Sequence, residues 1–201
     1  MAPKLVIDST TGGTFTFNTV NSFAGGVTTR NGTVVVAQSS SGGNGPFGSG
    51  TLTLSGGTLR ADSASDRTLT NDLAIAGPFT TTFIQSTASG RKLTFTPVSD
   101  AAISGGPTLR FNGAGGLGVQ FNSGQSVASG VLSIVQDNTA PVVFAGGMTV
   151  LAGGGLNIAQ NSSGAITVQN SLSLAEDMAV AMNGSGNVTV NFTSSLNIVG
   201  N

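Results

Sequence analysis

Short segments in which hydrophobic and polar residues alternate recur along the whole chain. Clear examples are TFTF (14–17), TLTL (51–54), LTFT (93–96) and SLSL (171–174). Alternation with a period of two is typical of a β-strand that buries one of its faces. The pattern therefore predicts many short strands, each with one face toward a core.

These segments themselves repeat at a nearly fixed period, in three series of inward positions. The first series contains Val34/Val36, Leu59/Ala61, Phe83, Leu109/Phe111, Leu132/Ile134, Leu156/Ile158 and Val180/Met182. The second contains Leu69, Leu93/Phe95, Leu117/Val119, Val142/Phe144, Ile166/Val168 and Val190/Phe192. The third contains Leu52/Leu54, Val127, Met148/Val150, Leu172/Leu174 and Leu196/Ile198. A fixed period of this length, roughly 24 residues, indicates a solenoid.

Three strands per period predict an all-β fold, a parallel β-helix (β-solenoid) of about eight turns of roughly 24 residues. One domain is expected over residues 1–201, with 1–30 as a less regular N-terminal turn and 31–201 as regular repeats. Leu5/Ile7 and Phe15/Phe17 fit none of the three series. In the second series large and small residues alternate through Phe95, Val119, Phe144, Val168 and Phe192, as expected for layers that fill a narrow core.

Composition supports this fold and excludes much chemistry. The chain has 31 Gly, 7% charged residues, and no His, Cys, Trp or Tyr. Imidazole and thiol catalysis, soft-ligand metal sites and disulfides are therefore excluded. A net charge of −1 is too small for an electrostatic surface for nucleic acid. Residues 1–110 hold all seven cations and five acids (net +2), and 111–201 hold three acids (net −3).

Residues 31–60, NGTVVVAQSSSGGNGPFGSGTLTLSGGTLR, carry an N-G-T strand, a Gly/Ser loop ending in G-S-G-T-L-T-L, and then S-G-G-T-L-R. This run resembles the passenger-associated strand repeat of bacterial autotransporters, and residues 14–30 and 67–77 fit the same repeat. The resemblance implies a right-handed β-helix that forms an extracellular stalk, with no catalytic residues. No secretory signal is found at residues 1–13, and the weakly polar stretch 141–156 is too broken by Gly for a membrane helix.

Several local patterns suggest sites and also have simpler structural explanations. Two G-x-G-x-x-G matches begin at Gly43 and Gly113, but a dinucleotide site needs a following helix, which neither has. Glu176-Asp177 is a weak calcium candidate. No catalytic, cofactor-binding or metal site is predicted, and the protein is expected not to be an enzyme.

The acidic residues do not follow the repeat. None of them recurs one period further along the chain, as a row of catalytic carboxylates would. Asp62, Asp66 and Asp72 lie close in sequence to Arg60 and Arg67, so a solvated loop with exposed ion pairs is expected there.

Outward residues suggest two further interpretations. Thr33, Thr58, Thr82 and Thr108 are expected to form one row, which could order water in an ice-binding solenoid or could simply be paired threonines. Arg60 and Arg110 are expected to share a face with Ile84 between them, as isolated surface charges. Without Trp or Tyr, a glycan site on this surface would consist of Asn, Ser and backbone groups.

Solenoid ends expose apolar core and unpaired strand edges unless something covers them. Here Leu196 and Ile198 belong to the last expected strand. The sequence therefore predicts an extracellular or cell-surface stalk, fibre or matrix element, partnered by other copies through its terminal turns or by the flanking solenoid of a longer chain. The alternative is an ice-binding or glycan-binding solenoid with an outward Thr/Asn face. No nucleic acid and no membrane insertion are expected.

Overall fold

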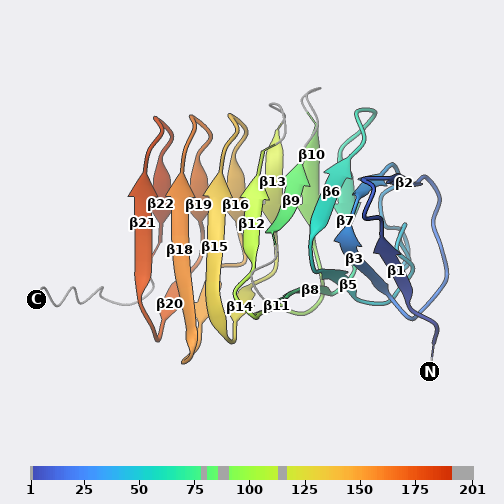
Figure 1. Ribbon diagram of the computed structural model, residues 1–201, viewed down its shortest axis with the longest axis horizontal. Helices are drawn as coiled ribbons and strands as arrows, with labels where there is room; N and C mark the ends of the chain where they lie inside the picture. The colour runs from blue at the N-terminus through green and yellow to red at the C-terminus, as the bar shows by residue number, and fades with distance from the viewer. Residues whose placement is uncertain (1, 78–80, 86–90, 113–116, 192–201) are drawn as a thin grey trace, which may run out of the picture.

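The structure is a computed structural model that describes residues 2–77, 81–85, 91–112 and 117–191. Three parallel sheets wind around one shared core as a β-solenoid of about seven turns, one fewer than expected (Figure 1). The described residues contain no helix, so the all-β class and the β-solenoid architecture are confirmed. The right-handed winding implied by the resemblance agrees with the general handedness of parallel crossover connections.

Each turn contributes one strand to each sheet over most of the length. Sheet A is formed, in spatial order, by β1 (Leu5–Asp8), β3 (Val27–Asn31), β5 (Leu52–Leu54), β8 (Leu73–Ala76), β11 (Ala101–Ser104), β14 (Gln125–Val127), β17 (Met148–Val150) and β20 (Leu172–Leu174). Sheet B is formed by β2 (Thr14–Phe17), β4 (Thr33–Val36), β6 (Gly57–Ala61), β9 (Thr81–Gln85), β12 (Thr108–Phe111), β15 (Gly130–Gln136), β18 (Gly154–Gln160) and β21 (Met178–Met182). Sheet C is formed by β7 (Arg67–Leu69), β10 (Lys92–Phe95), β13 (Gly118–Phe121), β16 (Val142–Phe144), β19 (Ile166–Val168) and β22 (Val188–Val190).

The register between turns is regular where the strands are long. β15 and β18 pair along their whole length, from Gly130 opposite Gly154 to Gln136 opposite Gln160. Like residues therefore stack, with Leu132 on Leu156 and Ile134 on Ile158. Each backbone group in such a ladder is paired with the turn above or below, and the inward side chains of all turns form one continuous core.

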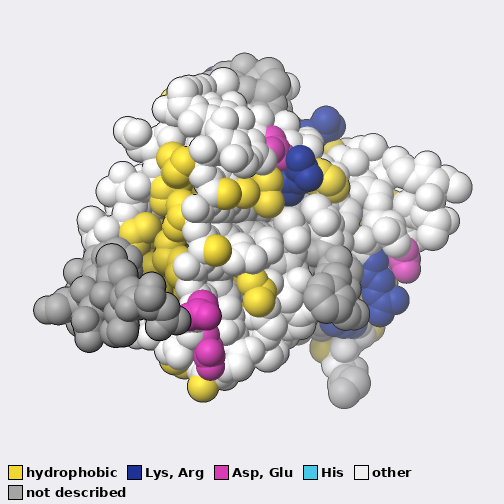
Figure 2. Space-filling view, turned by 60° about the vertical axis from the view of Figure 1, so that its left-hand side comes forward, with side chains coloured by type: hydrophobic (Ala, Val, Ile, Leu, Met, Phe, Trp, Pro, Cys, Tyr) yellow, Lys and Arg dark blue, Asp and Glu magenta, His cyan; other side chains and the backbone are white. Residues whose placement is uncertain are grey.

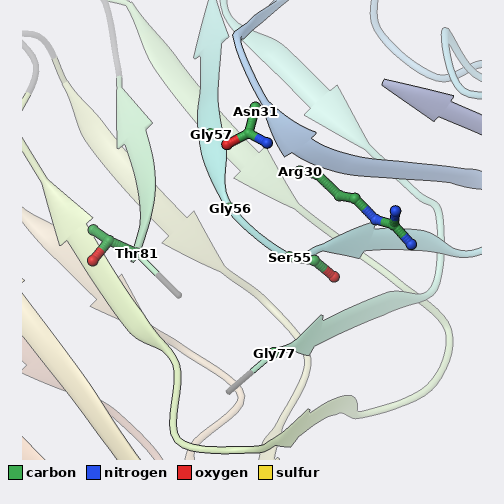
Figure 3. Close-up of a pocket in the computed structure, with 7 residues that line it drawn as sticks. All are labelled: Arg30, Asn31, Ser55, Gly56, Gly57, Gly77 and Thr81. Atoms are coloured by element: carbon green, nitrogen blue, oxygen red, sulfur yellow. The ribbon is translucent and has the colours of Figure 1, made fainter. Parts of the chain in front are cut away.

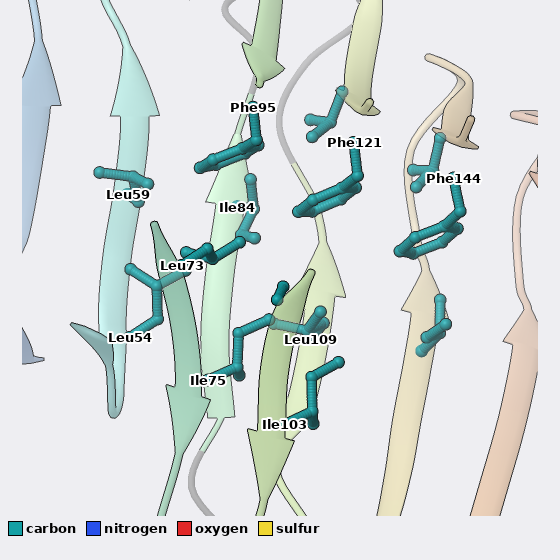
Figure 4. Packing of buried hydrophobic residues seen from close by; sticks show 14 of the residues in the cluster. Leu54, Leu59, Leu73, Ile75, Ile84, Phe95, Ile103, Leu109, Phe121 and Phe144 are labelled. Atoms are coloured by element: carbon teal, nitrogen blue, oxygen red, sulfur yellow. The ribbon is translucent and has the colours of Figure 1, made fainter. Parts of the chain in front are cut away.

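The largest side chains in the core are stacked phenylalanines (Figure 4). The ring centroids of Phe95 and Phe121 lie 4.8 Å apart with planes at 5°, and those of Phe121 and Phe144 lie 5.0 Å apart at 4°. All three residues are fully buried. The expected alternation of large and small residues is therefore wrong for these turns, because Val119 stacks on Leu93 and Phe121, not Val119, follows Phe95.

These differences arise because some turns are longer or shorter than the common repeat. The turn from Phe95 to Phe121 is longer than the common repeat. It leaves Leu117 outside the core, with 56% of its surface exposed. At the C-terminal end the turn is shorter, so Met178 and Val180 stack on Leu156 and Ile158 where Val180 and Met182 were expected. Similarly Val188 and Val190, not Val190 and Phe192, stack on Ile166 and Val168, and Phe192 lies outside the described residues.

A turn that gains a single residue has a larger consequence, because it reverses the two faces of a strand. Leu59 pairs with Ile84, so Ile84 is inward and fully buried. Phe83 was expected in the core, but it pairs with Thr58 and Arg110 on the outer face and is half-buried. Thr82 was expected on the surface and is 1% exposed.

The N-terminal turns are less regular but belong to the same stack. Leu5 and Ile7 lie in β1, which pairs with β3, and Phe15 and Phe17 lie in β2, which pairs with β4. No described residue before Arg67 contributes a strand to sheet C. Loops fill this side of the core, and the buried ring of Phe47 lies edge-on to Phe17 at 4.9 Å. None of the described residues forms a helix long and apolar enough to span a membrane.

Candidate functional site

The strongest charge interaction joins Asp62 and Arg67, which flank the loop between β6 and β7. Arg67 donates two hydrogen bonds to the carboxylate of Asp62, each of 2.6 Å, and both side chains are largely shielded from solvent. These hydrogen bonds, and the backbone N–H groups of Ala64 and Ser65, hold the pKa of Asp62 below its ordinary value of 3.8. An ion pair in this loop was expected from the sequence, although this one is less exposed than expected. A carboxylate held in this way is a poor candidate for a catalytic acid.

Because the folded state lowers the pKa of Asp62, the ion pair stabilises the fold above a pH of about 4, and this stability is lost as the pH falls through the folded-state value. We expect Asp62→Asn to lower the free energy of unfolding by no more than about 1 kcal/mol at neutral pH, with the difference disappearing in acid. Urea denaturation at several pH values measures this. Asp177→Asn is the control, because Asp177 makes no ion pair among the described residues; an equal, pH-independent loss in both variants would contradict the interpretation.

Most other carboxylates accept hydrogen bonds from the neighbouring turn. Asp66 accepts from the backbone N–H of Lys92, Asp72 from Ser99, Asp100 from Gly124 and Glu176 from Gly153, at 3.0 to 3.2 Å. Asp137 accepts from Arg110 and from the amide of Asn161. Through these hydrogen bonds the acidic residues connect the corners of successive turns. They do not converge on a common point.

Nothing in the described part of the chain gathers ligands for a cation. No three acidic side chains there lie close enough to hold a metal ion. Glu176 and Asp177 are exposed at the corner between β20 and β21, where they line a shallow hollow with Val131, Gly154 and Met178. Two adjacent acids without further oxygen ligands make a weak calcium site.

A surface hollow of about 490 Å³ lies at the corner between sheets A and B. Its polar side chains are those of Arg30, Asn31, Ser55 and Thr81, and its floor is glycine backbone. In Figure 3 these side chains point in different directions, and Arg30 extends away from Thr81. The side-chain amide of Asn31 donates a hydrogen bond to Asp8 at 2.7 Å, so this donor already has a partner within the protein. The hollow has no convergent set of groups that would fix a ligand.

The expected threonine row is interrupted. Thr33 does pair with Thr58, and Thr14 precedes them in the same row. The next residue in that row is Phe83, followed by Arg110, Val135 and Ala159. Thr108 stands in another row, next to Thr81. Arg60 and Arg110 are both on the outer face of sheet B, as expected, but Arg60 pairs with Gln85 and Ile84 is buried between the rows.

Among the described strands, the outward row with the most threonines lies on sheet C. It contains Thr68, Thr94, Gln120, Val143, Thr167 and Thr189 in successive turns. Gln120 and Val143 interrupt it at the centre, so no continuous threonine surface extends along the rod. The first G-x-G-x-x-G match, from Gly43 to Gly48, is a turn that leads into strand β5. Gly113 and Gly115 of the second match lie outside the described residues.

Two columns of stacked polar side chains were not predicted from the sequence. Gln136 and Gln160 stack at the corner between sheets B and C, both fully buried, and each donates to a backbone carbonyl in the corner that follows it. Beside them, Asn183 donates to Asn161 at 2.9 Å and Asn161 donates to Asp137 at 2.8 Å. The recurrence of QD at 136–137 as QN at 160–161 was a visible signal of both columns.

The remaining candidate is the C-terminal end of the described solenoid, formed by β20, β21 and β22. These are the last described strands of their sheets, and the backbone N–H of Leu172 in β20 donates to the carbonyl of Asn191, just beyond β22, at 3.1 Å. Side chains in inward positions are partly exposed there, with Val180 at 46% and Met182 at 50%. Figure 2 shows hydrophobic side chains gathered on this side of the molecule, next to acidic ones. Leu196 and Ile198, expected to form the terminal surface, lie outside the described residues.

Comparisons of the chain with protein-family models, with curated proteins and with solved structures find no match. The fold therefore defines the class of the protein, a β-solenoid repeat protein, on its own geometry. The narrower resemblance to the autotransporter strand repeat rests on residues 14–60 and 67–77 of the sequence alone.

Proposed function

We propose that this protein is a non-enzymatic structural element, a stalk, fibre or matrix component that acts outside the cell or at its surface. The observation that supports the proposal most directly is the stack of three parallel sheets around one core. In such a stack length and stiffness come from repetition, since every turn hydrogen-bonds to the next. The resemblance of residues 31–60 to an autotransporter stalk repeat supports the location.

The polar chemistry of the described residues is consistent with this role. The acidic residues and the amide columns bind neighbouring turns to one another. The partners that we propose are other copies of the chain, or the flanking solenoid of a longer chain, in contact with the terminal turns. A net charge of −1 gives no support for nucleic acid as a partner.

The second candidate is a solenoid that binds ice or a glycan through an outward Thr/Asn face. The threonines of sheet C, interrupted by Gln120 and Val143, are the observation in its favour. Because two interruptions at the centre divide the row, we favour the structural role.

Negative-stain microscopy combined with two binding measurements tests these alternatives. For a stalk or fibre we expect elongated rods, no thermal hysteresis in freezing solutions, and no retention on a glycan array. Hysteresis that is lost in Thr94→Leu and Thr167→Leu variants would instead support the ice-binding face, and specific retention of a glycan would support an adhesin. Labelling of intact cells with a membrane-impermeant reagent tests the proposed location.

A further inference from the structure

We propose that Asn31 is a site of spontaneous deamidation, in which the neighbouring backbone nitrogen converts its side-chain amide into a carboxylate. This inference goes beyond the proposed structural role and does not depend on it. The chain contains four Asn-Gly pairs, at residues 31–32, 44–45, 112–113 and 183–184. Glycine after asparagine favours the reaction, because no side chain shields the attacking nitrogen and the glycine backbone adopts many conformations. The structure distinguishes these pairs by what the glycine N–H contacts.

The reaction needs no partner other than water. The backbone nitrogen of Gly32 loses its proton to solvent base and attacks Cγ of Asn31. A bond forms between this nitrogen and Cγ, the bond from Cγ to Nδ2 breaks, and the amide leaves as ammonia with a proton taken from water. The product is a five-membered succinimide ring. Water then opens the ring at either of its two carbonyl carbons, which leaves aspartate or isoaspartate at position 31.

The backbone at Gly32 is held in place without using the N–H group that must react. Its carbonyl accepts a hydrogen bond from the N–H of Thr58 at 2.9 Å, whereas no backbone carbonyl among the described residues accepts its own N–H. The carbonyl of Asn31 accepts a long hydrogen bond, of 3.3 Å, from Ser9 N–H, where the register of β1 on β3 is irregular. The nitrogen of Gly32 can therefore lose its proton and approach Cγ without breaking a backbone hydrogen bond of its own.

Solvent reaches this pair directly. Asn31 is exposed at the end of β3 and lines the surface hollow between sheets A and B, where it lies next to Gly57 (Figure 3). The hollow, of about 490 Å³, has room for the water and base that the reaction consumes. The leaving nitrogen already contacts a carboxylate, since Nδ2 donates to Oδ1 of Asp8 at 2.7 Å. This contact stabilises the positive charge that the nitrogen acquires when it is protonated and departs.

In two of the other pairs the glycine N–H is already engaged. Gly45 is buried and donates to the carbonyl of Gly48 at 3.1 Å, and Gly184 donates to the carbonyl of Gln160 at 2.8 Å. Each nitrogen must lose this hydrogen bond before it can attack, which slows the reaction. Gly113 lies outside the described residues, so its pair is not part of this comparison.

Conversion of Asn31 is expected to weaken the pairing of β1 with β3. The amide that donates to Asp8 becomes a carboxylate, so two like charges come into contact. The guanidinium of Arg30, 3.9 Å from Asp8, offsets little of this repulsion because 58% of the Arg30 side chain is exposed. Isoaspartate also adds a methylene to the main chain at the last residue of β3, which displaces the carbonyl that accepts from Ser9.

The main experiment compares three asparagines within one unmodified chain. Folded protein, and protein unfolded in guanidinium chloride, are incubated in mildly alkaline buffer made with heavy-oxygen water, and their peptides are mapped by mass spectrometry. In the unfolded chain we expect similar rates at Asn31, Asn44 and Asn183, because glycine follows each of them. In the folded chain we expect Asn31 to convert at least about fivefold faster than either of the others, with heavy oxygen incorporated at position 31. Equal rates in the folded chain, or a faster rate at Asn44 or Asn183, would overturn the inference.

Substitutions test the reaction and its consequence separately. Asn31→Gln should show no conversion at position 31, because its longer side chain would have to close a less favourable six-membered ring; conversion at an unchanged rate would refute attack by the Gly32 nitrogen. Asn31→Asp supplies the charge of the product, and Asn183→Asp adds the same charge in the last described turn. We expect backbone hydrogen exchange of residues 5–9 to be at least about threefold faster in Asn31→Asp and unchanged in Asn183→Asp. Equal exchange in both variants would refute the weakened pairing of β1.

Discussion

Replacing Phe144 by Asp is expected to abolish folding. Phe144 is fully buried in sheet C, its ring stacks on Phe121 at 5.0 Å, and no cation in the described core is available to pair with a new carboxylate. An unpaired buried charge costs several kcal/mol, and removal of the ring leaves a cavity worth about 3–5 kcal/mol more. Together these exceed much of the roughly 5–15 kcal/mol that stabilises a typical domain. Far-UV circular dichroism and urea denaturation measure the loss.

Thr167→Asp is the matched control, since it introduces the same carboxylate one turn away on the same sheet. Thr167 pairs with Val143 and points outward, so its charge remains in water. We expect a change within about 0.5 kcal/mol, typical of surface substitutions. Equal tolerance of both substitutions would mean that the inward and outward rows have been assigned to the wrong faces.

The period of the sequence was sufficient to predict the class of fold because each strand repeats the same local pattern. Alternation identifies the inward face, and its recurrence at a nearly fixed interval implies that turns stack, as Leu132 and Leu156 do. The pattern fails where a corner gains or loses residues. A two-residue difference keeps the alternation and shifts the register, as at Phe121, whereas a single residue exchanges the faces, as at Phe83 and Ile84.

Corner lengths could not be predicted because glycine- and serine-rich corners give no periodic signal. The same limit applies to candidate sites. The pairing of Asp62 with Arg67 was predictable because both lie in one short loop. The hydrogen bond from Gly124 to Asp100 was not, since it depends on which corner residues of two turns face each other. The buried glutamines were not predicted because a polar residue in an inward position breaks the alternation that identifies the inward face.

The second large effect is expected at Gly118, where β13 begins. Its φ of +92° is unfavourable for any residue with a Cβ, and an added Cβ would lie 2.0 Å from the backbone oxygen of Pro141 in the next turn. That oxygen accepts a hydrogen bond from the backbone N–H of Val119 at 3.0 Å. The two turns therefore cannot move apart to make room for the Cβ without losing the hydrogen bonds between them. We expect Gly118→Ala to lower the free energy of unfolding by about 3 kcal/mol or more, from backbone strain of about 1–2 kcal/mol plus the lost pairing.

Gly153→Ala separates the two causes. Gly153 has nearly the same conformation, with a φ of +84°, but nothing lies within 4 Å of an added Cβ. We therefore expect only the strain, about 1–2 kcal/mol, in urea denaturation of this variant. The difference between the two variants measures how closely successive turns are packed at the corners. If both lost the same stability, contact between turns would contribute nothing at Gly118, and the stacked register of β13 on β16 would be wrong.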